Sequence, residues 1–315
     1  MSETITIEHR SFTGEADGPH LLITGGVHGD EWEPMAACRR LIQELESKVR
    51  RGRVTIAPVV NVAAFRRRQR TAEDGLDLAR VFPGREDGSI TERIAAAATK
   101  LIEASDYYID LHTGGTPVQI LSLAGYGLIP NLEVREKGRA MAHAFGLPII
   151  WATNARQHGR SLSVARDADI PSMYTECGGG GKNSQEGIDS YFEGCLNVAS
   201  MLGIIDPRPD PTPPLYVVED DRDESGHMQL MHRSPMDGFF EPAVKLADVV
   251  REGDTIGHVV DELGTKRVAV LAEHDGLVLH LRCGPSVVEG DTLGGMLPLT
   301  EPGTVRFDYE EPEGD

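Results

Sequence analysis

The stretch Thr24-Gly25-Gly26-Val27-His28-Gly29-Asp30-Glu31 decides how the rest of the sequence is interpreted. It follows the apolar run 21–23, which indicates a buried strand, and its paired glycines indicate a tight turn at the carboxyl end of that strand. A helical pattern of apolar residues then covers residues 32–45. In open α/β sheets, ligands bind outside the carboxyl ends of the strands. His28 and Glu31 are therefore candidate metal ligands at such a strand end.

Alternating strand and helix patterns continue from this stretch over most of the chain. Three further apolar runs end in polar residues, at Asn61, His112 and Glu176, and the last two are followed by glycine-rich segments. Helical patterns lie at residues 32–45, 89–104, 132–145, 161–168 and 185–202. Ser89 begins the second of these, and Glu92 lies three residues later, which is the pattern of a capping box. The alternation predicts an α/β fold with a largely parallel sheet.

The composition changes at residues 206–214, where five prolines in nine residues indicate a stiff linker. Short strand patterns separated by turn residues follow, at residues 228–232, 238–241, 255–260, 267–272 and 276–281. Residues 234–239 resemble residues 272–277, which indicates an internal two-fold repeat in a small β barrel or sandwich. The expected organisation is a catalytic α/β domain at 1–206, a proline-rich linker at 207–214, a β-rich domain at 215–300 and an acidic tail at 301–315.

The 315-residue chain is 40% hydrophobic and 26% charged, as in ordinary globular proteins, and its formal net charge is −19. This negative surplus argues against nucleic acid and anionic membranes as partners. The first eight residues lack the basic start and apolar core of a signal peptide, and no apolar run approaches the roughly 20 residues of a membrane helix. The four cysteines form no CxxC pair, so we expect reduced, buried thiols in a cytoplasmic protein. The sequence leaves open whether the chains form a homo-oligomer.

Three residues form a candidate zinc site. A catalytic Zn²⁺ typically binds three nitrogen or oxygen ligands and keeps one position for water. His28, Glu31 and His112 are such a set, and they follow apolar strands, where side chains distant in sequence converge. Taken singly, His28 also suits a polar turn that caps the next helix, and His112 suits a hydrogen-bonded core position. Asp110, two residues before His112, either orients its imidazole ring or faces elsewhere.

A hydrolytic metal site also needs a base and a group that stabilises negative charge. Glu176 is the best candidate for the base, because it ends a strand and precedes Cys177 and four glycines that leave room for a ligand. The loop at residues 66–70 supplies arginines, but a basic cluster is usually a solvated surface, and the residues alone do not select Arg70. The chain has no GxSxG elbow, no P-loop and no GxGxxG after a strand, so nothing supports those other chemistries.

Five motifs occur in order along nearly the whole chain: GGVHGDE (25–31), N-x-x-A-F-x-x-x-x-R (61–70), DLAR-x-FPG (77–84), DLHTGG (110–115) and TECGG (175–179). Together they resemble the succinylglutamate desuccinylase/aspartoacylase family, a branch of the zinc carboxypeptidase group. The resemblance implies a zinc-carboxypeptidase-like α/β fold, with a mainly parallel or mixed sheet flanked by helices and a smaller C-terminal β barrel-sandwich domain. It implies one Zn²⁺ per chain, bound by His28, Glu31 and His112. It also implies Glu176 as general base and acid, and Arg70 as the group that polarises the scissile carbonyl.

The implied activity is hydrolysis of the amide bond of a small N-acyl amino acid or N-acyl diamino acid, the expected small-molecule partner. The chain departs from the family at one position, because the Asn that precedes the arginine in the usual DLNR is here Ala79, with Arg80 retained. In the family that pair holds the substrate carboxylate, and losing the amide removes a hydrogen bond worth about 1–3 kcal/mol. Arg80, Asn61 and Arg160 are the candidate substrate-binding residues, although Arg160 equally suits a surface or helix-cap position.

Three alternatives stay open at this point. A zinc carboxypeptidase that acts on peptides would use the same metal ligands. A non-catalytic binding or carrier protein is a second alternative, since the β-rich pattern also resembles lipoyl and biotinyl carrier domains; Lys266, however, is only a weak candidate for the acceptor lysine. A third is an enzyme that uses another divalent metal, because histidine and carboxylate ligands do not exclude Co, Mn or Fe.

Overall fold

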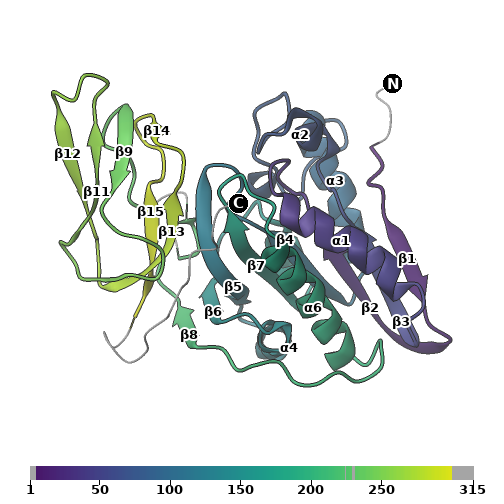
Figure 1. The fold of residues 1–315 in the computed structure, drawn as a ribbon. Coiled ribbons are helices and arrows are strands. Elements are labelled where there is room, and N and C mark those ends of the chain that lie inside the picture. The colour runs from purple at the N-terminus through teal and green to yellow at the C-terminus, as the bar shows by residue number, and fades with distance from the viewer. Residues whose placement is uncertain (1–4, 224, 229–230, 300–315) are drawn as a thin grey trace.

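The computed structural model describes residues 5–223, 225–228 and 231–299, and its centre is a mixed sheet in which eleven strands are described (Figure 1). The main path of this sheet is β1-β3-β2-β4-β7-β5-β13-β10; β6 pairs with β5 and β8, and β15 pairs with β13. The strands are β1 (Arg10–Thr13), β2 (Ala16–Thr24), β3 (Arg51–Ala57), β4 (Tyr107–His112), β5 (Val118–Leu128), β6 (Ile149–Asn154), β7 (Ser172–Gly179), β8 (Tyr216–Asp220), β10 (Val249–Val250), β13 (Gly276–Arg282) and β15 (Gly294–Pro298).

The strands on which the candidate ligands were predicted run parallel at the middle of this sheet. The apolar run 21–23 of β2 is fully buried, with β3 on one side and β4 on the other. Thr24 of β2 lies opposite Asp110 of β4, and His112 of β4 lies opposite Glu176 of β7. The polar residues that follow these strands therefore meet at one edge of the sheet. Strand β5 is antiparallel to β7, so the sheet is mixed, one of the two arrangements expected.

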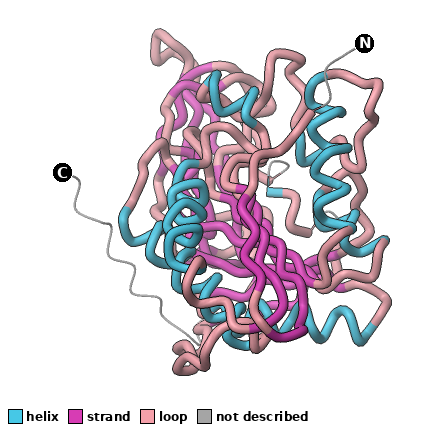
Figure 2. The backbone as a smooth tube through the Cα atoms, turned by 90° about the vertical axis from the view of Figure 1, so that its right-hand side faces the viewer, coloured by secondary structure: helices cyan, strands magenta, loops and turns pink. Residues whose placement is uncertain are grey.

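Helices cover both faces of the large sheet (Figures 1 and 2). One face packs against α1 (Trp32–Leu45), α4 (Leu132–Phe145) and α6 (Gln185–Met201), and the other against α2 (Val62–Arg67), α3 (Ile90–Glu103), α5 (Ser161–Asp167) and the 3₁₀ turn η1 (Leu78–Arg80). The predicted bounds of α1 and α4 are confirmed. The capping box is also confirmed, since Ser89 accepts a hydrogen bond from the Glu92 N–H and donates its own N–H to the Glu92 carboxylate at 2.8 Å.

A second sheet consists of β12 (Arg267–Leu271), β11 (Thr255–Val260), β9 (Gly238–Pro242) and β14 (Ser286–Val287). Its pairing reflects the two-fold repeat found in the sequence: β11 pairs with β9 as β15 pairs with β13, and β14 pairs with β9 as β10 pairs with β13. Each half of the repeat thus gives its short strand to the sheet of the other half. This exchange ties the two sheets into one β-rich module, residues 238–298.

The β-rich module is joined directly to the large sheet, because β13 pairs with β5. Strand β8, which follows the proline-rich segment and precedes the module, also belongs to the large sheet through its pairing with β6. The large sheet therefore continues beyond residue 206, and the division of the chain into domains at that residue stays a prediction. Strands β5 and β8 were not expected from the sequence. The strand predicted at residues 228–232 is wrong, since none of its described residues lies in a strand. The acidic tail at 301–315 lies outside the described residues.

The four cysteines are free thiols. Cys38, Cys177 and Cys195 are buried as predicted, but Cys283 is exposed just after β13, so the prediction of buried thiols is wrong for this residue. Among the helices that the structure describes, none is both long enough and apolar enough to cross a membrane.

Candidate active site

The ends of β2 and β4 bring the three predicted metal ligands together. His28 and Glu31 lie in the loop after β2, and His112 is the last residue of β4. The candidate donor atoms of the three side chains lie within 4.8 Å of one another, and the two imidazole centroids are 5.1 Å apart. The N-cap of α1 is Glu31, without a side-chain capping bond, so the alternative in which His28 caps this helix is wrong.

Glu31 lies between the two imidazole rings. Its Oε1 is 2.6 Å from Nδ1 of His28, and its Oε2 is 3.0 Å from Nδ1 of His112. The backbone N–H of Thr113 also donates to Oε2 at 3.2 Å. The Nδ1 atoms of both histidines, which we call the inner nitrogens, and the Glu31 carboxylate therefore face one point, whereas the Nε2 atoms are the outer nitrogens.

The outer nitrogen of each histidine is held by an aspartate. Nε2 of His28 donates to Oδ1 of Asp77 at 3.0 Å, and Nε2 of His112 lies 3.1 Å from Oδ2 of Asp110. Asp110 is oriented in turn by hydrogen bonds from the hydroxyl groups of Thr24, at 2.9 Å, and Ser161. Asp110 thus makes the contact with His112 that the predicted orienting role requires, and Asp77 makes the equivalent contact with His28.

The charges around the histidines favour a bound cation. Burial opposes a charge on His112, but the carboxylates of Asp110 and Glu31 outweigh it and raise the pKa of the imidazole well above its usual value. Such a cluster holds either protons or a metal ion. Because a carboxylate fixes the proton on each outer nitrogen, each inner nitrogen presents a lone pair, as metal-binding histidines do. Two imidazole nitrogens and one carboxylate fit the ligand set of a catalytic Zn²⁺.

Glu176 reaches the same point from β7. Its register opposite His112 places the two side chains on one face of adjacent strands. The carboxyl is buried, and its Oε2 has no hydrogen-bond partner. Burial, reinforced by the nearby negative charge of Glu31, raises the pKa of Glu176 to about 7. A carboxyl with this pKa both accepts and releases a proton near neutral pH.

Arg70 follows the short helix α2 and is fixed by Asp77. Its Nε and Nη2 donate to Oδ2 of Asp77 at 3.1 and 3.0 Å, and its Nη1 lies 3.5 Å from Oε1 of Glu31. Burial would lower the pKa of the Arg70 guanidinium, but Asp77 and Glu31 outweigh it and raise that pKa. Arg70 is therefore a permanent cation beside the candidate metal ligands. The structure distinguishes it from its neighbours Arg66 and Arg67, which lie in α2 and are exposed.

Arg80 and Arg160 come together through their backbones. Arg80 belongs to η1, and Arg160 directly precedes α5. Gly159, the residue before Arg160, packs closely on the backbone of Arg80, and a Cβ on this glycine would lie 2.4 Å from the Arg80 carbonyl oxygen. Burial, together with the positive charges of Arg160 and Arg70, lowers the pKa of Arg80 to about 10. Both arginines line the cavity that contains the metal ligands. Two neighbouring guanidinium groups of this kind attract an anion.

Asn61 is the one predicted site residue that does not line the cavity. It is fully buried as the N-cap of α2, and its Oδ1 accepts a hydrogen bond from the Ala64 N–H at 3.0 Å. It is not among the residues that line the cavity. Its role in substrate binding stays a prediction.

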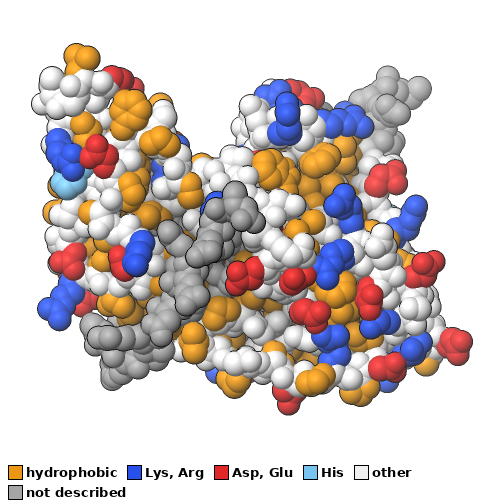
Figure 3. Space-filling model, viewed as in Figure 1, with side chains coloured by type: hydrophobic (Ala, Val, Ile, Leu, Met, Phe, Trp, Pro, Cys, Tyr) orange, Lys and Arg blue, Asp and Glu red, His pale blue; other side chains and the backbone are white. Residues whose placement is uncertain are grey.

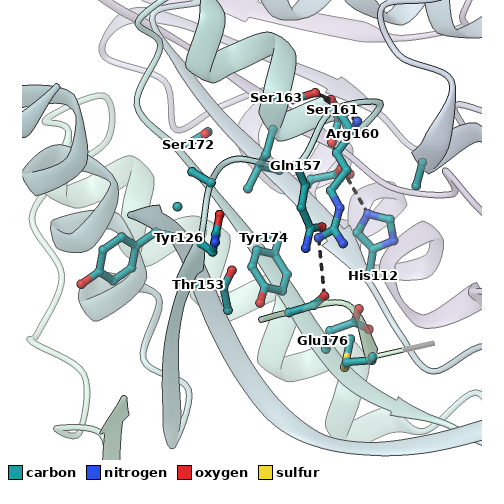
Figure 4. A pocket seen from close by; sticks show the side chains of 18 of the residues that line it. His112, Tyr126, Thr153, Gln157, Arg160, Ser161, Ser163, Ser172, Tyr174 and Glu176 are labelled. Carbon is teal, nitrogen blue, oxygen red and sulfur yellow. Dashed lines mark hydrogen bonds and ion pairs between the residues drawn. The ribbon is translucent and has the colours of Figure 1, made fainter. Parts of the chain in front are cut away.

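A cavity of about 230 Å³ joins the remaining groups. Its wall includes His28, Glu31, Arg70, Arg80, His112, Arg160 and Glu176. His280 and Thr292 of the β-rich module line another part of the wall. Figure 3 shows a notch between the upper part of this module and the rest of the molecule. In Figure 4, Arg160, Gln157 and Tyr174 lie between Thr153 and His112. The module thus completes a site that begins at the strand ends.

Sequence reasoning missed two residues of the site for which a signal existed, Asp77, which holds two residues of the cavity wall, and Tyr174, which lines the cavity itself. Asp77 opens the DLAR motif, but its part in holding His28 and Arg70 was not inferred. Tyr174 lies two residues before Glu176, and the two-residue period of a strand places both on one face. Thr153, by contrast, comes from β6, whose position beside β5 no local pattern indicates.

Taken together, the sheet, the ligand cluster and the cavity are typical of hydrolases that use a metal ion. A sequence profile of the succinylglutamate desuccinylase/aspartoacylase catalytic domain matches residues 17–202. N-alpha-acetyl-L-2,4-diaminobutyric acid deacetylase from Halomonas elongata is 34% identical over 294 residues, which cover 90% of this chain and 84% of that protein. Succinylglutamate desuccinylase from Pseudomonas paraeruginosa is 31% identical over 134 residues, 39% of each chain.

Solved structures of similar proteins match this chain over nearly its whole length. The product-bound ectoine utilization protein from Ruegeria pomeroyi has a TM-score of 0.84 and 27% identity, and the match covers 93% of this chain and 89% of that one. A succinylglutamate desuccinylase/aspartoacylase from Rhodobacter sphaeroides has a TM-score of 0.82 and 28% identity, with 93% and 88% covered. The chain belongs to the succinylglutamate desuccinylase/aspartoacylase family, as its motifs predicted. It is an amidohydrolase of the kind that acts on carbon–nitrogen bonds other than peptide bonds.

Proposed function

We propose that this protein is a zinc-dependent deacylase, which hydrolyses the amide bond of a small N-acyl amino acid or N-acyl diamino acid. The products are a carboxylate and a free amine. The observation that carries the proposal is that His28, Glu31 and His112 converge with Glu176 in one cavity. Two relatives support the substrate class by their names, one a deacetylase of an acetylated diamino acid and the other a succinylglutamate desuccinylase.

Glu176 is proposed to move the proton of the reaction. A Zn²⁺ held by His28, Glu31 and His112 would supply Lewis acidity and lower the pKa of a bound water to about 7. The unpartnered Oε2 of Glu176 takes the proton from the attacking water. Glu176 then gives this proton to the leaving nitrogen, because an amide anion is too basic to leave unprotonated. Its pKa of about 7 suits both transfers.

Arg70 is proposed to stabilise the oxyanion. Attack on the acyl carbon places negative charge on the carbonyl oxygen, which a fixed cation stabilises most when it needs no rearrangement. Asp77 holds the Arg70 guanidinium by two hydrogen bonds, with Nη1 3.5 Å from the Glu31 carboxylate. The cation therefore lies in place, beside the ligands, before the substrate binds.

Arg80 and Arg160 are proposed to hold the carboxylate of the substrate. An anion between them would relieve the repulsion by which Arg160 lowers the pKa of Arg80. The N–H of Ala79 donates to Asp77 at 2.9 Å, so the turn that aims Arg80 does not depend on the side chain at position 79. The loss of the family's amide thus removes one donor and leaves the direction of Arg80 unchanged.

The test is a substrate panel with the purified protein. N-acetyl and N-succinyl derivatives of amino acids and diamino acids are compared with short peptides, in the presence of chelator and after re-addition of zinc, cobalt or manganese. We expect chelator-sensitive hydrolysis of the N-acyl amino acids, and about one zinc per chain by elemental analysis. Faster hydrolysis of peptides would identify a carboxypeptidase instead. Full activity without any bound metal would refute the proposal.

A further inference from the structure

Tyr174 places a hydroxyl-bearing side chain on the cavity floor, away from the candidate metal ligands. It lies on β7 two residues before Glu176, so both side chains project from the same face of the strand. Two residues of a strand span roughly 6.6 Å. Tyr174 is partly buried and lines the cavity, and Figure 4 shows it between Thr153 and Glu176. It is therefore one strand repeat further into the cavity than the proposed base.

The position of the Tyr174 ring is fixed by its neighbours on the sheet. Gly125 of β5 lies directly opposite, and a Cβ added to this glycine would lie 2.2 Å from Cε1 of Tyr174. The ring thus occupies the space that a side chain at position 125 would need. Thr153 of β6 lines the same cavity, and Figure 4 shows its side chain beside that of Tyr174. The packing at position 125 therefore fixes the direction of the ring and of its hydroxyl.

The pair of hydroxyl groups keeps hydrogen-bonding capacity for a ligand. Each hydroxyl carries one donor and also accepts, so the pair could bond a polar ligand atom even where the two hydroxyls contact each other. Burial, with the charge of Glu176, raises the pKa of Tyr174, so the phenol stays neutral. Tyr174 packs on one side against an apolar cluster that contains Trp151 and Ile120. Gln157 and Arg160 lie on its other side (Figure 4). A polar ligand atom here has a defined partner.

We propose that Tyr174 and Thr153 select substrates whose amino-acid side chain ends in a hydrogen-bonding group, such as an amine or a hydroxyl, over substrates with an alkyl end. This inference rests on the proposed function, because it takes the scissile nitrogen to lie at Glu176. From that nitrogen, four bonds of about 1.5 Å each in a zigzag reach roughly 5 Å, so a side chain of two methylenes and one terminal atom reaches the level of Tyr174.

Three substrates of equal length test this directly. Nα-acetyl-2,4-diaminobutyrate, Nα-acetylhomoserine and Nα-acetylnorvaline differ only in a terminal ammonium, hydroxyl or methyl group. Because a site built around hydrogen bonds rejects an analogue that lacks the polar group, we expect kcat/KM of the wild type for the methyl compound to be at least about 100-fold below that of a polar one. The first two substrates distinguish an ammonium from a neutral donor.

The variant Tyr174→Phe removes the hydroxyl and keeps the ring. We expect kcat/KM for the preferred polar substrate to fall about 10- to 100-fold, while the value for Nα-acetylnorvaline changes less than about threefold. Thr153→Val is expected to act in the same direction. Tyr107→Phe, at the start of β4, is the matched control and should leave all three values unchanged. Zinc content and melting temperature of each variant report whether the fold is intact.

Two results would overturn the inference. If Tyr174→Phe lowers all three values equally, the hydroxyl supports the site in general and does not select side chains. If the wild type hydrolyses Nα-acetylnorvaline as fast as the two polar substrates, the site does not select the end of the side chain. A wild-type protein that hydrolyses none of the three would overturn the selection, and one that also hydrolyses no other N-acyl amino acid of the substrate panel would overturn the proposed function as well. An active wild type whose ratio is unchanged by Tyr174→Phe would overturn the selection alone.

Discussion

The variant Glu176→Gln separates the catalytic use of this side chain from its effect on stability. The amide keeps the size of the carboxyl but cannot take up the proton of the attacking water. General base catalysis contributes about 10²- to 10⁴-fold, so we expect kcat to fall by at least this much. The ligands His28, Glu31 and His112 are unchanged, so zinc content should stay at the wild-type level.

The same change is expected to stabilise the metal-free protein at alkaline pH. Burial and Glu31 raise the pKa of Glu176 from 4.5 to about 7 in the folded state, so folding favours the protonated form. The stability that this proton provides is complete below pH 4.5 and is lost as the pH rises through 7. The total loss is roughly 3 kcal/mol, because each tenfold change in proton affinity is worth about 1.4 kcal/mol. Glutamine does not titrate and escapes this loss.

Urea denaturation of chelator-treated wild type and variant, at pH 4.5, 6 and 8, measures this difference. Subtracting the two unfolding free energies removes the titrating groups that do not interact with Glu176, whereas its interaction with His28, His112 and Glu31 stays within the measured difference. We expect the variant to gain up to about 3 kcal/mol relative to the wild type between pH 4.5 and pH 8. A difference that is independent of pH would show that Glu176 is not held at a raised pKa. Wild-type turnover in the variant would remove Glu176 from the mechanism.

Three other substitutions test single contacts. Asp77→Ala takes the acceptor from Nε2 of His28, and we expect a 10- to 100-fold weaker zinc affinity in competition with a chromophoric chelator; unchanged affinity would contradict the orienting role. Arg70→Lys keeps a charge but loses the two-pronged contact with Asp77, so kcat should fall about 100-fold or more in steady-state assays, and a smaller loss would argue against a fixed oxyanion partner. Ser89→Ala removes the cap of α3, and urea denaturation should show a loss of about 1 kcal/mol with unchanged zinc content.

Much of the catalytic half was predictable because its signals are local. The apolar run of β2, the glycines that follow it and the helical pattern of α1 are all contained in residues 21–45. Parallel strands end at one edge, so the pattern of strand followed by histidine implied that His28 and His112 would meet. The same reasoning placed Glu176 beside them, because β7 is the next strand along. The positions of these residues thus follow from strand periodicity and the rule for parallel sheets.

The β-rich half was less predictable because its partners are distant in sequence. The pattern of β13 was recognised as a strand, but nothing local indicates that His280 would pair opposite Ile120 of β5. Strand β5 itself was missed, since it is buried on both sides over much of its length and lacks a clear alternation. The consequence for the site is direct, because His280 and Thr292 line the cavity only through this long-range pairing.

Asp77 explains why the departure at Ala79 is compatible with an intact site. One oxygen of Asp77 accepts from His28 and from the backbone N–H of Ala79, while the other accepts twice from Arg70. A single carboxylate therefore orients the candidate metal ligand His28, fixes the guanidinium of Arg70 and closes the turn that leads to Arg80. Position 79 contributes backbone groups to this arrangement, its N–H to Asp77 at 2.9 Å and its carbonyl to Nη1 of Arg80 at 2.7 Å, so any residue except proline can supply them. If the proposed function holds, the loss of the family's side chain at this position is expected to change substrate selectivity before it changes the chemistry.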